Sequence, residues 1–171
     1  MRLTTFCLLV ITLFVACVED SIREINLHVF CGGENISGNK FQEDNQYLYN
    51  AKCRTDLYSR TGSYGFKLNK AQQYGPSLRI DSIKQGDVIY ASVFRKRGSA
   101  SAKLVIASKD EVQYESNHIS LEEKVEWELV KSSFVAQQDY DYVTVYLWNP
   151  LKEDAYLDDL SIDCFRQNTK P

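Results

Sequence analysis

The strongest constraint on the fold is a strictly alternating segment near the end of the chain, residues 141–148. One side of this segment carries Val143, Val145 and Leu147, and the other side carries Tyr142, Thr144, Tyr146 and Trp148. A period of two residues is that of a β-strand with one buried face. The following Asn149-Pro150 breaks the pattern and supplies a turn. The segment therefore predicts a strand of a sheet that packs on a core.

A second strand-like segment, residues 155–164, follows this turn and carries two adjacent carboxylates, Asp158 and Asp159. Because successive strand residues face opposite sides, we expect these carboxylates to lie in two different environments. One of them is expected at the rim of the core. An ionised carboxylate in that position needs either a cation or backbone N–H groups.

Short runs with strand character recur along the rest of the chain. They cover residues 25–30, 63–68, 77–83, 88–95, 103–108, 112–116 and 126–131, with one short strand inside the polar segment 40–55. Turns rich in Gly, Asn, Pro and charged residues separate them, and no long helical period interrupts them. The length of 171 residues suits one domain with a single core. We therefore predict an all-β fold, an antiparallel β-sandwich (jelly roll) of about nine or ten strands.

The first residues have the pattern of an export signal. Arg2 precedes the apolar run 6–15, which is too short for a transmembrane helix, and residues 1–16 are read as a signal peptide. Phe14-Val-Ala-Cys17 resembles a bacterial lipobox, so Cys17 is the candidate lipid anchor, with residues 17–24 as a tether. We expect an exported protein, a lipoprotein of the cell envelope or surface or otherwise a secreted one, with its domain at 25–166 and a tail at 167–171.

Charge and motifs exclude several classes of function. The formal net charge is −3, and no basic block is longer than Arg95-Lys96-Arg97, which argues against a nucleic-acid partner. The sequence contains no serine-hydrolase elbow, zinc-protease motif, phosphate loop or dinucleotide motif. His28 and His118 are the two histidines, and both are expected on the surface. We therefore expect no enzymatic activity.

Four segments, in this order, resemble the β-jelly-roll carbohydrate-binding modules attached to xylanases and cellulases, which belong to the galactose-binding-like group. They are Thr61-Gly-Ser-Tyr-Gly-Phe-Lys-Leu68, Gln85-Gly-Asp-Val-Ile-Tyr-Ala-Ser-Val-Phe-Arg-Lys96, Val125-Glu-Trp-Glu-Leu-Val130 with Ser133-Phe134, and Ala155-Tyr-Leu-Asp-Asp-Leu-Ser-Ile162. The resemblance spans residues 25–165. It implies a jelly roll whose first and last strands lie side by side.

Three cysteines remain once the signal and the anchor are set aside, and three cannot all pair within one chain. They are Cys31, Cys53 and Cys164. The adjacent first and last strands of the resembled family imply a Cys31–Cys164 disulfide in an oxidising compartment. A Cys31–Cys53 disulfide is the alternative. No Cys-x-x-Cys or Cys/His spacing supports a metal site.

The resemblance also implies a structural Ca²⁺ between the early loop and the closing strand. Asp158 matches the closing ligand. Phe41 is followed by Gln42, where the family usually has Glu, so Glu43 or Asp44 would serve after a shift in position. Gln42, Glu43 and Asp158 are therefore the candidate ligands. The alternative is that Asp158 accepts hydrogen bonds from backbone N–H groups and no cation is present.

Aromatic residues opposite the core positions suggest a binding surface. Tyr90 and Phe94 alternate with apolar residues in one strand, and Tyr146 and Trp148 do so in another. If both strands belong to one sheet, these four rings line one surface on which sugar rings can stack. The alternative places Tyr90 in the core. We predict a non-catalytic module of the cell envelope that binds polysaccharide or glycan. A structural or adhesion protein that uses the same sandwich for protein contacts is the alternative.

Overall fold

The structure is a computed structural model that describes residues 24–43, 46–99, 102–109, 112–114, 117–119, 126–151 and 153–166. The predicted signal peptide, the anchor residue Cys17, most of the tether and the tail lie outside these residues. The described residues form fourteen β-strands and one short 3₁₀ turn, η1 (Ala51–Cys53). No helix within the described residues is long and apolar enough to cross a lipid bilayer.

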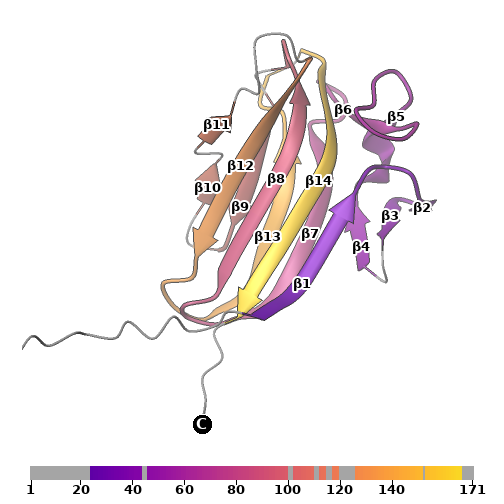
Figure 1. The fold of residues 1–171 in the computed structure, drawn as a ribbon. Helices are drawn as coiled ribbons and strands as arrows, with labels where there is room; N and C mark the ends of the chain where they lie inside the picture. Colours follow the sequence, from indigo (N-terminus) through magenta and orange to yellow (C-terminus); the bar gives the residue numbers. More distant parts are fainter. Residues whose placement is uncertain are drawn as a thin grey trace, which may run out of the picture.

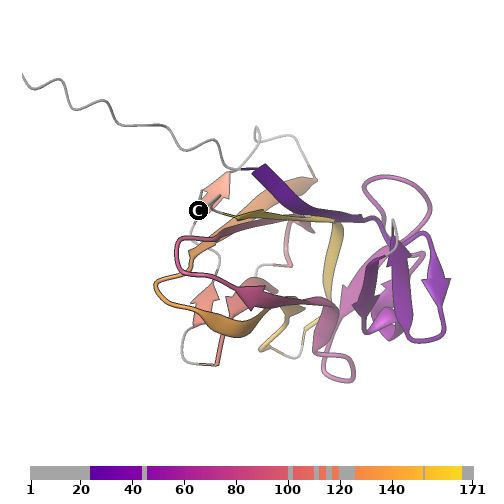
Figure 2. The ribbon, with the colours of Figure 1, turned by 90° about the horizontal axis from the view of Figure 1, so that it is seen from below.

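The strands form two antiparallel sheets that face each other as two layers (Figures 1 and 2). The first, here the β14 sheet, contains in order β11 (Asn117–Ile119), β12 (Trp127–Val135), β8 (Val88–Lys96), β14 (Ala155–Arg166), β6 (Gly65–Leu68) and β5 (Arg54–Thr55), and β1 (Glu24–Cys31) also pairs with β14. The second, the β13 sheet, contains β10 (Val112–Tyr114), β9 (Lys103–Ala107), β13 (Tyr140–Trp148), β7 (Tyr74–Ile83), β4 (Gln46–Tyr49), β3 (Lys40–Glu43) and β2 (Ile36–Ser37). The predicted antiparallel sandwich is confirmed.

One core fills the space between the two sheets. In β13 it receives the residues that alternation predicts to be inside: Val143, Val145 and Leu147. In β8 it receives Ile89, Ala91 and Val93. All six are buried, and burial of such side chains contributes about 25 cal/mol per Å² of apolar surface. The period-two pattern thus fixed the inward face of both strands correctly.

The number of strands exceeds the predicted nine or ten. Residues 40–55 contain β3, β4, η1 and β5 rather than one short strand, and β11 lies in a segment expected to be a loop. The sequence did not separate β3 from β4 because each is a short strand of four residues near the margin of its sheet. Each buries only one large apolar side chain, Phe41 in β3 and Leu48 in β4, which is too weak a periodic signal to detect in isolation.

The expectation that Asp158 and Asp159 occupy different environments is wrong. The pairing of β14 with β8 shifts register between Asp158 and Ser161, and Asp159 has a left-handed φ of 53°. Such a bulge interrupts the alternation of side chains along a strand. Both carboxylates are consequently buried on the same side, with relative exposures of 0% for Asp158 and 5% for Asp159.

The predicted Cys31–Cys164 disulfide is contradicted, although the predicted neighbourhood of the first and last strands is correct. In the β1–β14 ladder Cys31 pairs with Leu160, whereas Cys164 pairs with Leu27. Four residues along a strand correspond to about 13 Å, and a disulfide needs Cα atoms closer than about 7 Å. All three described cysteines are free and buried. Burial raises the pKa of the Cys53 thiol, and the neighbouring Cys31 raises it further.

Candidate functional site

The four predicted binding aromatics all point away from the core, as alternation indicates. Tyr90 has 49% of its surface exposed, which excludes the alternative that it is a core residue. Phe94, Tyr146 and Trp148 are half-buried. However, Tyr90 and Phe94 belong to the β14 sheet, whereas Tyr146 and Trp148 belong to the β13 sheet. The condition of one shared sheet is not met, so the structure divides the predicted surface between two opposite faces.

The outer face of the β13 sheet gathers aromatic side chains from three adjacent strands. Ser77 of β7 pairs with Tyr49 of β4 on one side and with Tyr146 of β13 on the other, so all three share one row across the sheet. Tyr74 pairs with Trp148 in a neighbouring row. The rings of Tyr74 and Tyr146 lie 6.1 Å apart between centroids, tilted by 50°. We call this surface the aromatic face; its members are Tyr47, Tyr49, Tyr74, Tyr142, Tyr146 and Trp148.

A bulge in β7 brings Tyr74 beside Tyr146. The register of β7 against β13 shifts between Tyr146 and Trp148. The Asn50 side chain donates hydrogen bonds to the carbonyl of Gly75 at 3.0 Å and to the Ser77 hydroxyl at 3.4 Å, which ties both sides of the bulge to one residue. Glycine fits at position 75 without displacing a neighbour, whereas the Cβ of any other residue would lie 2.9 Å from the Cβ of Leu147.

Charged side chains lie among these rings. The Arg79 guanidinium is 3.9 Å from the Tyr142 ring centroid, and its Nε donates to Asp81 Oδ1 at 2.7 Å. Lys40 Nζ lies 4.8 Å from the ring centroid of Tyr49 and 5.3 Å from that of Tyr47. Cation–π contacts at exposed sites contribute about 0.5–1 kcal/mol, enough to orient a ring without burying it. The aromatic face therefore combines flat apolar surfaces with hydrogen-bonding groups at their edges.

Sequence reasoning missed Tyr47, Tyr49, Tyr74 and Tyr142 as members of this face, although it placed Tyr142 on the outer side of its strand. The first two lie in the segment expected to be mostly loop, and Tyr74 was expected in the loop before β7. For β4 the sequence offers only the three-residue alternation Tyr47-Leu48-Tyr49, which is too short to identify a strand without the structure. No comparable signal exists for Tyr74, because the bulge that places it depends on contacts distant in sequence.

On the opposite face, the other two predicted aromatics differ in accessibility. The Tyr90 ring stands edge-on to Phe165, with centroids 5.6 Å apart, and remains open to solvent. The Phe94 ring is covered by the Arg60 guanidinium, which lies 3.6 Å from its centroid. Tyr90 is therefore available to a ligand in this structure, whereas Phe94 is already stacked with a side chain of the protein itself.

The residues predicted as calcium ligands, Gln42, Glu43 and Asp158, lie on β3 and β14. Gln42 is exposed and Glu43 half-buried, and as successive strand residues they face opposite sides of β3. Asp158 Oδ2 accepts the backbone N–H groups of Arg60 at 2.6 Å and Thr61 at 3.1 Å. Its Oδ1 accepts the N–H of Asp159 at 2.8 Å.

Among the described residues, which exclude Asp44, no group of three or more His, Cys, Asp or Glu side chains is arranged to hold a metal ion. The arrangement fits the alternative in which Asp158 is an acceptor of backbone hydrogen bonds.

The carboxylate pair fastens the loop around residue 60 to the closing strand. Arg60 Nη1 donates to Asp159 Oδ2 at 2.7 Å, and the Thr61 hydroxyl donates to Asp159 Oδ1. Burial raises the pKa of Asp158 to about 6, an effect that the N–H donors oppose and the charge of Asp159 reinforces. These contacts are internal to the fold, and we assign the pair a structural role.

Comparisons with known proteins support the fold. No family model and no curated protein matches the sequence. The structure is similar to that of the CBM22-1 xylan-binding domain of Paenibacillus barcinonensis Xyn10C, with a TM-score of 0.50 and 17% identity over 84% of this chain and 96% of that one.

The CBM22-1–CBM22-2 tandem domain of the same enzyme gives a TM-score of 0.50 and 15% identity, over 87% of this chain and 48% of that one. At this identity the similarity concerns the fold. The chain has the jelly-roll fold of these carbohydrate-binding modules, and the resemblance seen in its motifs is confirmed at that level.

Proposed function

We propose that this domain binds polysaccharide through the aromatic face of the β13 sheet. The observation that carries the proposal is the juxtaposition of Tyr74, Tyr146 and Trp148 on a sheet face that also carries Arg79, whose guanidinium stacks on Tyr142. Sugar rings present apolar C–H faces that stack on aromatic rings, and their hydroxyls need hydrogen-bonding groups nearby. A row of rings across adjacent strands suits an extended chain of sugars better than a single compact ligand.

The similarity to structures described as xylan-binding supports polysaccharide as the ligand class and makes xylan oligosaccharides the first probe. The role we propose is non-catalytic. A glycosidase needs two carboxylates that face one cleft. On the aromatic face, Asp81 is paired with Arg79, which suits positioning of a ring better than proton transfer.

We also propose that the protein acts at the cell envelope, held by a lipid on Cys17, or is otherwise secreted. What supports this is the apolar segment at the start of the sequence and the lipobox-like Phe14-Val-Ala-Cys17. A membrane-bound module of this kind would hold polysaccharide near the cell. Metabolic labelling with palmitate, compared between the natural chain and Cys17→Ala, tests the anchor.

A glycan array with the full-length mature protein tests the proposed function. We expect selective binding to polysaccharide chains, xylan oligosaccharides among them. The alternative, an adhesion protein that uses the sandwich for protein contacts, predicts no glycan binding at high protein concentration together with recovery of an envelope protein in a pull-down. That pair of results would replace our proposal with the alternative.

A further inference from the structure

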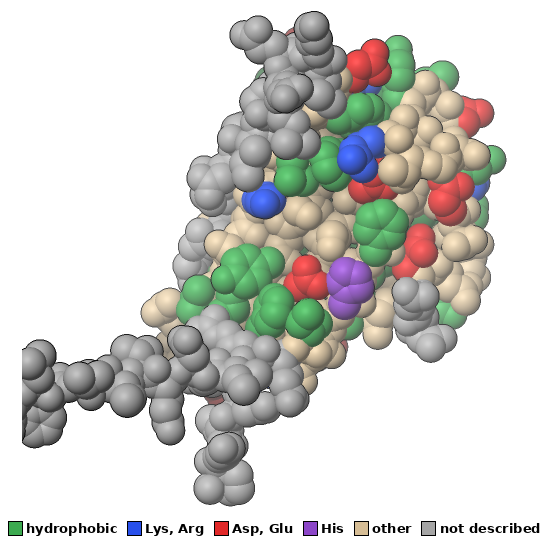
Figure 3. Space-filling model, in the orientation of Figure 1, with side chains coloured by type: hydrophobic (Ala, Val, Ile, Leu, Met, Phe, Trp, Pro, Cys, Tyr) green, Lys and Arg blue, Asp and Glu red, His purple; other side chains and the backbone are tan. Residues whose placement is uncertain are grey.

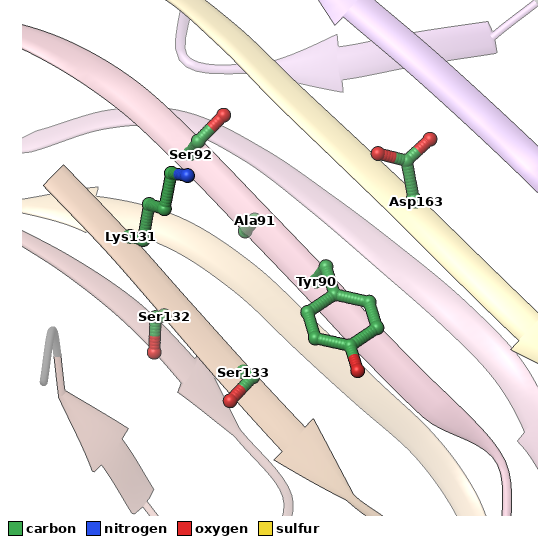
Figure 4. Close-up of a pocket in the computed structure, with 7 residues that line it drawn as sticks. All are labelled: Tyr90, Ala91, Ser92, Lys131, Ser132, Ser133 and Asp163. Atoms are coloured by element: carbon green, nitrogen blue, oxygen red, sulfur yellow. The ribbon is translucent and has the colours of Figure 1, made fainter. Parts of the chain in front are cut away.

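A separate groove lies on the opposite side of the molecule, on the outer face of the β14 sheet. It crosses β12, β8 and β14 and encloses about 340 Å³ (Figure 4). Its lining side chains are Tyr90, Ser92, Lys131, Ser133 and Asp163, with Ala91 and Ser132 beneath them. Figure 3 shows this side of the molecule, where hydrophobic side chains lie among charged ones.

The register of the sheet explains why a hollow forms here. One row across the strands runs Ser133, Tyr90, Asp163 and His28, and the next runs Lys131, Ser92, Ser161 and Phe30. In the second row the small side chains of Ser92 and Ser161 lie on the adjacent strands β8 and β14, between the larger side chains of Lys131 and Phe30. Because Ser92 and Ser133 are small, the Tyr90 ring on one side and the Lys131 side chain on the other rise above a floor that carries hydroxyl groups.

The chemical groups of the groove are those of a sugar site. Tyr90 offers an open ring face, held in place by edge contact with Phe165. Ser92 and Ser133 can both donate and accept hydrogen bonds. Asp163 is fixed by His28 Nδ1 at 2.6 Å, so a carboxylate acceptor is presented in a defined position. In Figure 4 the Lys131 side chain extends toward Ser92, which places a donor on the other side of the groove.

The charges of the groove select among ligands. Lys131 on β12 and Asp163 on β14 have opposite signs and stand on either side of β8. An acidic sugar is attracted by Lys131 and repelled by Asp163, and an amine the reverse, so neither gains a net attraction that offsets the cost of desolvating its charge. A neutral polyol can donate a hydrogen bond to Asp163 and accept one from Lys131. The volume lies at the small end of the range for ligand pockets, about 300–1,000 Å³.

We propose that this groove is a second saccharide site, which takes one or two neutral sugar residues, such as the end or side branch of a chain. It does not depend on the aromatic face, because the two lie on different sheets with the core between them. A molecule with both sites can hold two glycan chains at once and so link them.

The test is a titration of the ¹⁵N-labelled protein with xylobiose, cellobiose, galactose and glucuronic acid, followed by ¹H–¹⁵N NMR. We expect at least one neutral sugar to shift the amides of residues 90–92 and 131–133 in a saturable manner. We expect glucuronic acid to shift these amides at least tenfold more weakly. Trp148→Ala, which alters the aromatic face, should leave the groove shifts unchanged.

Ser92→Val fills the floor of the groove and should weaken the groove response at least tenfold, and Tyr90→Ala, at an exposed position, should do the same. The proposal is overturned if no neutral sugar shifts these amides, or if Ser92→Val and Tyr90→Ala leave the response unaltered. It is also overturned if Trp148→Ala abolishes the response, since the shifts would then arise from the aromatic face. Failure of the aromatic face alone would instead show as loss of shifts around residues 74 and 146 with the groove response intact.

Discussion

The buried carboxylate of Asp158 makes the stability of the fold depend on pH in a defined direction. Its side chain has 0% exposure, and burial raises its pKa from the usual 3.8 to about 6. Because the folded-state pKa lies above the unfolded one, the native state binds more protons than the unfolded state between about pH 4 and pH 6. The contribution of this group is therefore fully present below about pH 4 and is lost as the pH rises through about 6.

The size of this effect follows from the two pKa values. A difference of about two units corresponds to about 3 kcal/mol of unfolding free energy, since one unit is worth about 1.36 kcal/mol. Asp158→Asn replaces the carboxyl group with a neutral group of the same shape and cannot lose a proton. At pH 4 the unfolded carboxyl group is already about half ionised, so part of this effect lies below that pH. Relative to the natural protein, the variant should therefore gain about 2 kcal/mol as the pH rises from 4 to 7.

Urea denaturation at pH 4, 5, 6 and 7 measures both proteins under identical conditions. Comparing the two profiles removes the pH dependence of all other groups, which both proteins share. Parallel profiles, with a constant difference in unfolding free energy from pH 4 to pH 7, would refute the reasoning. They would mean that the three N–H donors at Asp158 fully offset the effect of burial.

Three further predictions concern the scaffold. Because backbone N–H groups already donate to both oxygens of Asp158, we expect neither EDTA nor Ca²⁺ to change the melting temperature. If EDTA lowered the melting temperature of the natural protein but not that of Asp158→Ala, a Ca²⁺ ion bound at Asp158 would be established instead. Gly75→Ala should lower the unfolding free energy by about 1–3 kcal/mol, because the new Cβ would lie 2.9 Å from the buried Leu147. The control Gly32→Ala, whose Cβ would lie 3.6 Å from its nearest neighbour, should lower it much less. Equal losses in thermal unfolding would contradict the close packing at position 75. Peptide mapping without reducing agent should find no Cys31–Cys164 bridge, and its detection would contradict the β1–β14 register.

The sequence determined which side of a strand faces the core but not which strands share a sheet. Alternation around Tyr90 and around Tyr146 correctly placed both rings outside. It carried no information on sheet membership, because both sheets of a sandwich bury one face in the same core. The four predicted aromatic residues therefore do face outward, but they lie on two different sheets and do not form one surface.

Local departures from regular pairing were the other obstacle. At Asp159 the chain adopts a left-handed conformation that Asp tolerates without requiring it, so residue type gives no warning of the bulge. The residue types of β1 and β14 also give no warning of their register, in which four residues along the ladder separate Cys31 from Cys164. Both features depend on contacts between distant segments, which periodicity within one segment cannot reveal.

The proposal that polysaccharide binds the aromatic face is tested most directly by calorimetric titration of xylan oligosaccharides, or the best glycan from the array, into four proteins. These are the natural protein, Tyr146→Ala, Trp148→Ala and the control Tyr58→Ala, which removes an exposed aromatic ring from a different part of the surface. We predict saturable binding by the natural protein and the same Kd in the control Tyr58→Ala. In Tyr146→Ala and in Trp148→Ala the Kd should rise at least tenfold, which corresponds to a loss of about 1.4 kcal/mol or more of binding free energy. Equal affinity in all four proteins, or no saturable binding by the natural protein, would contradict the assignment.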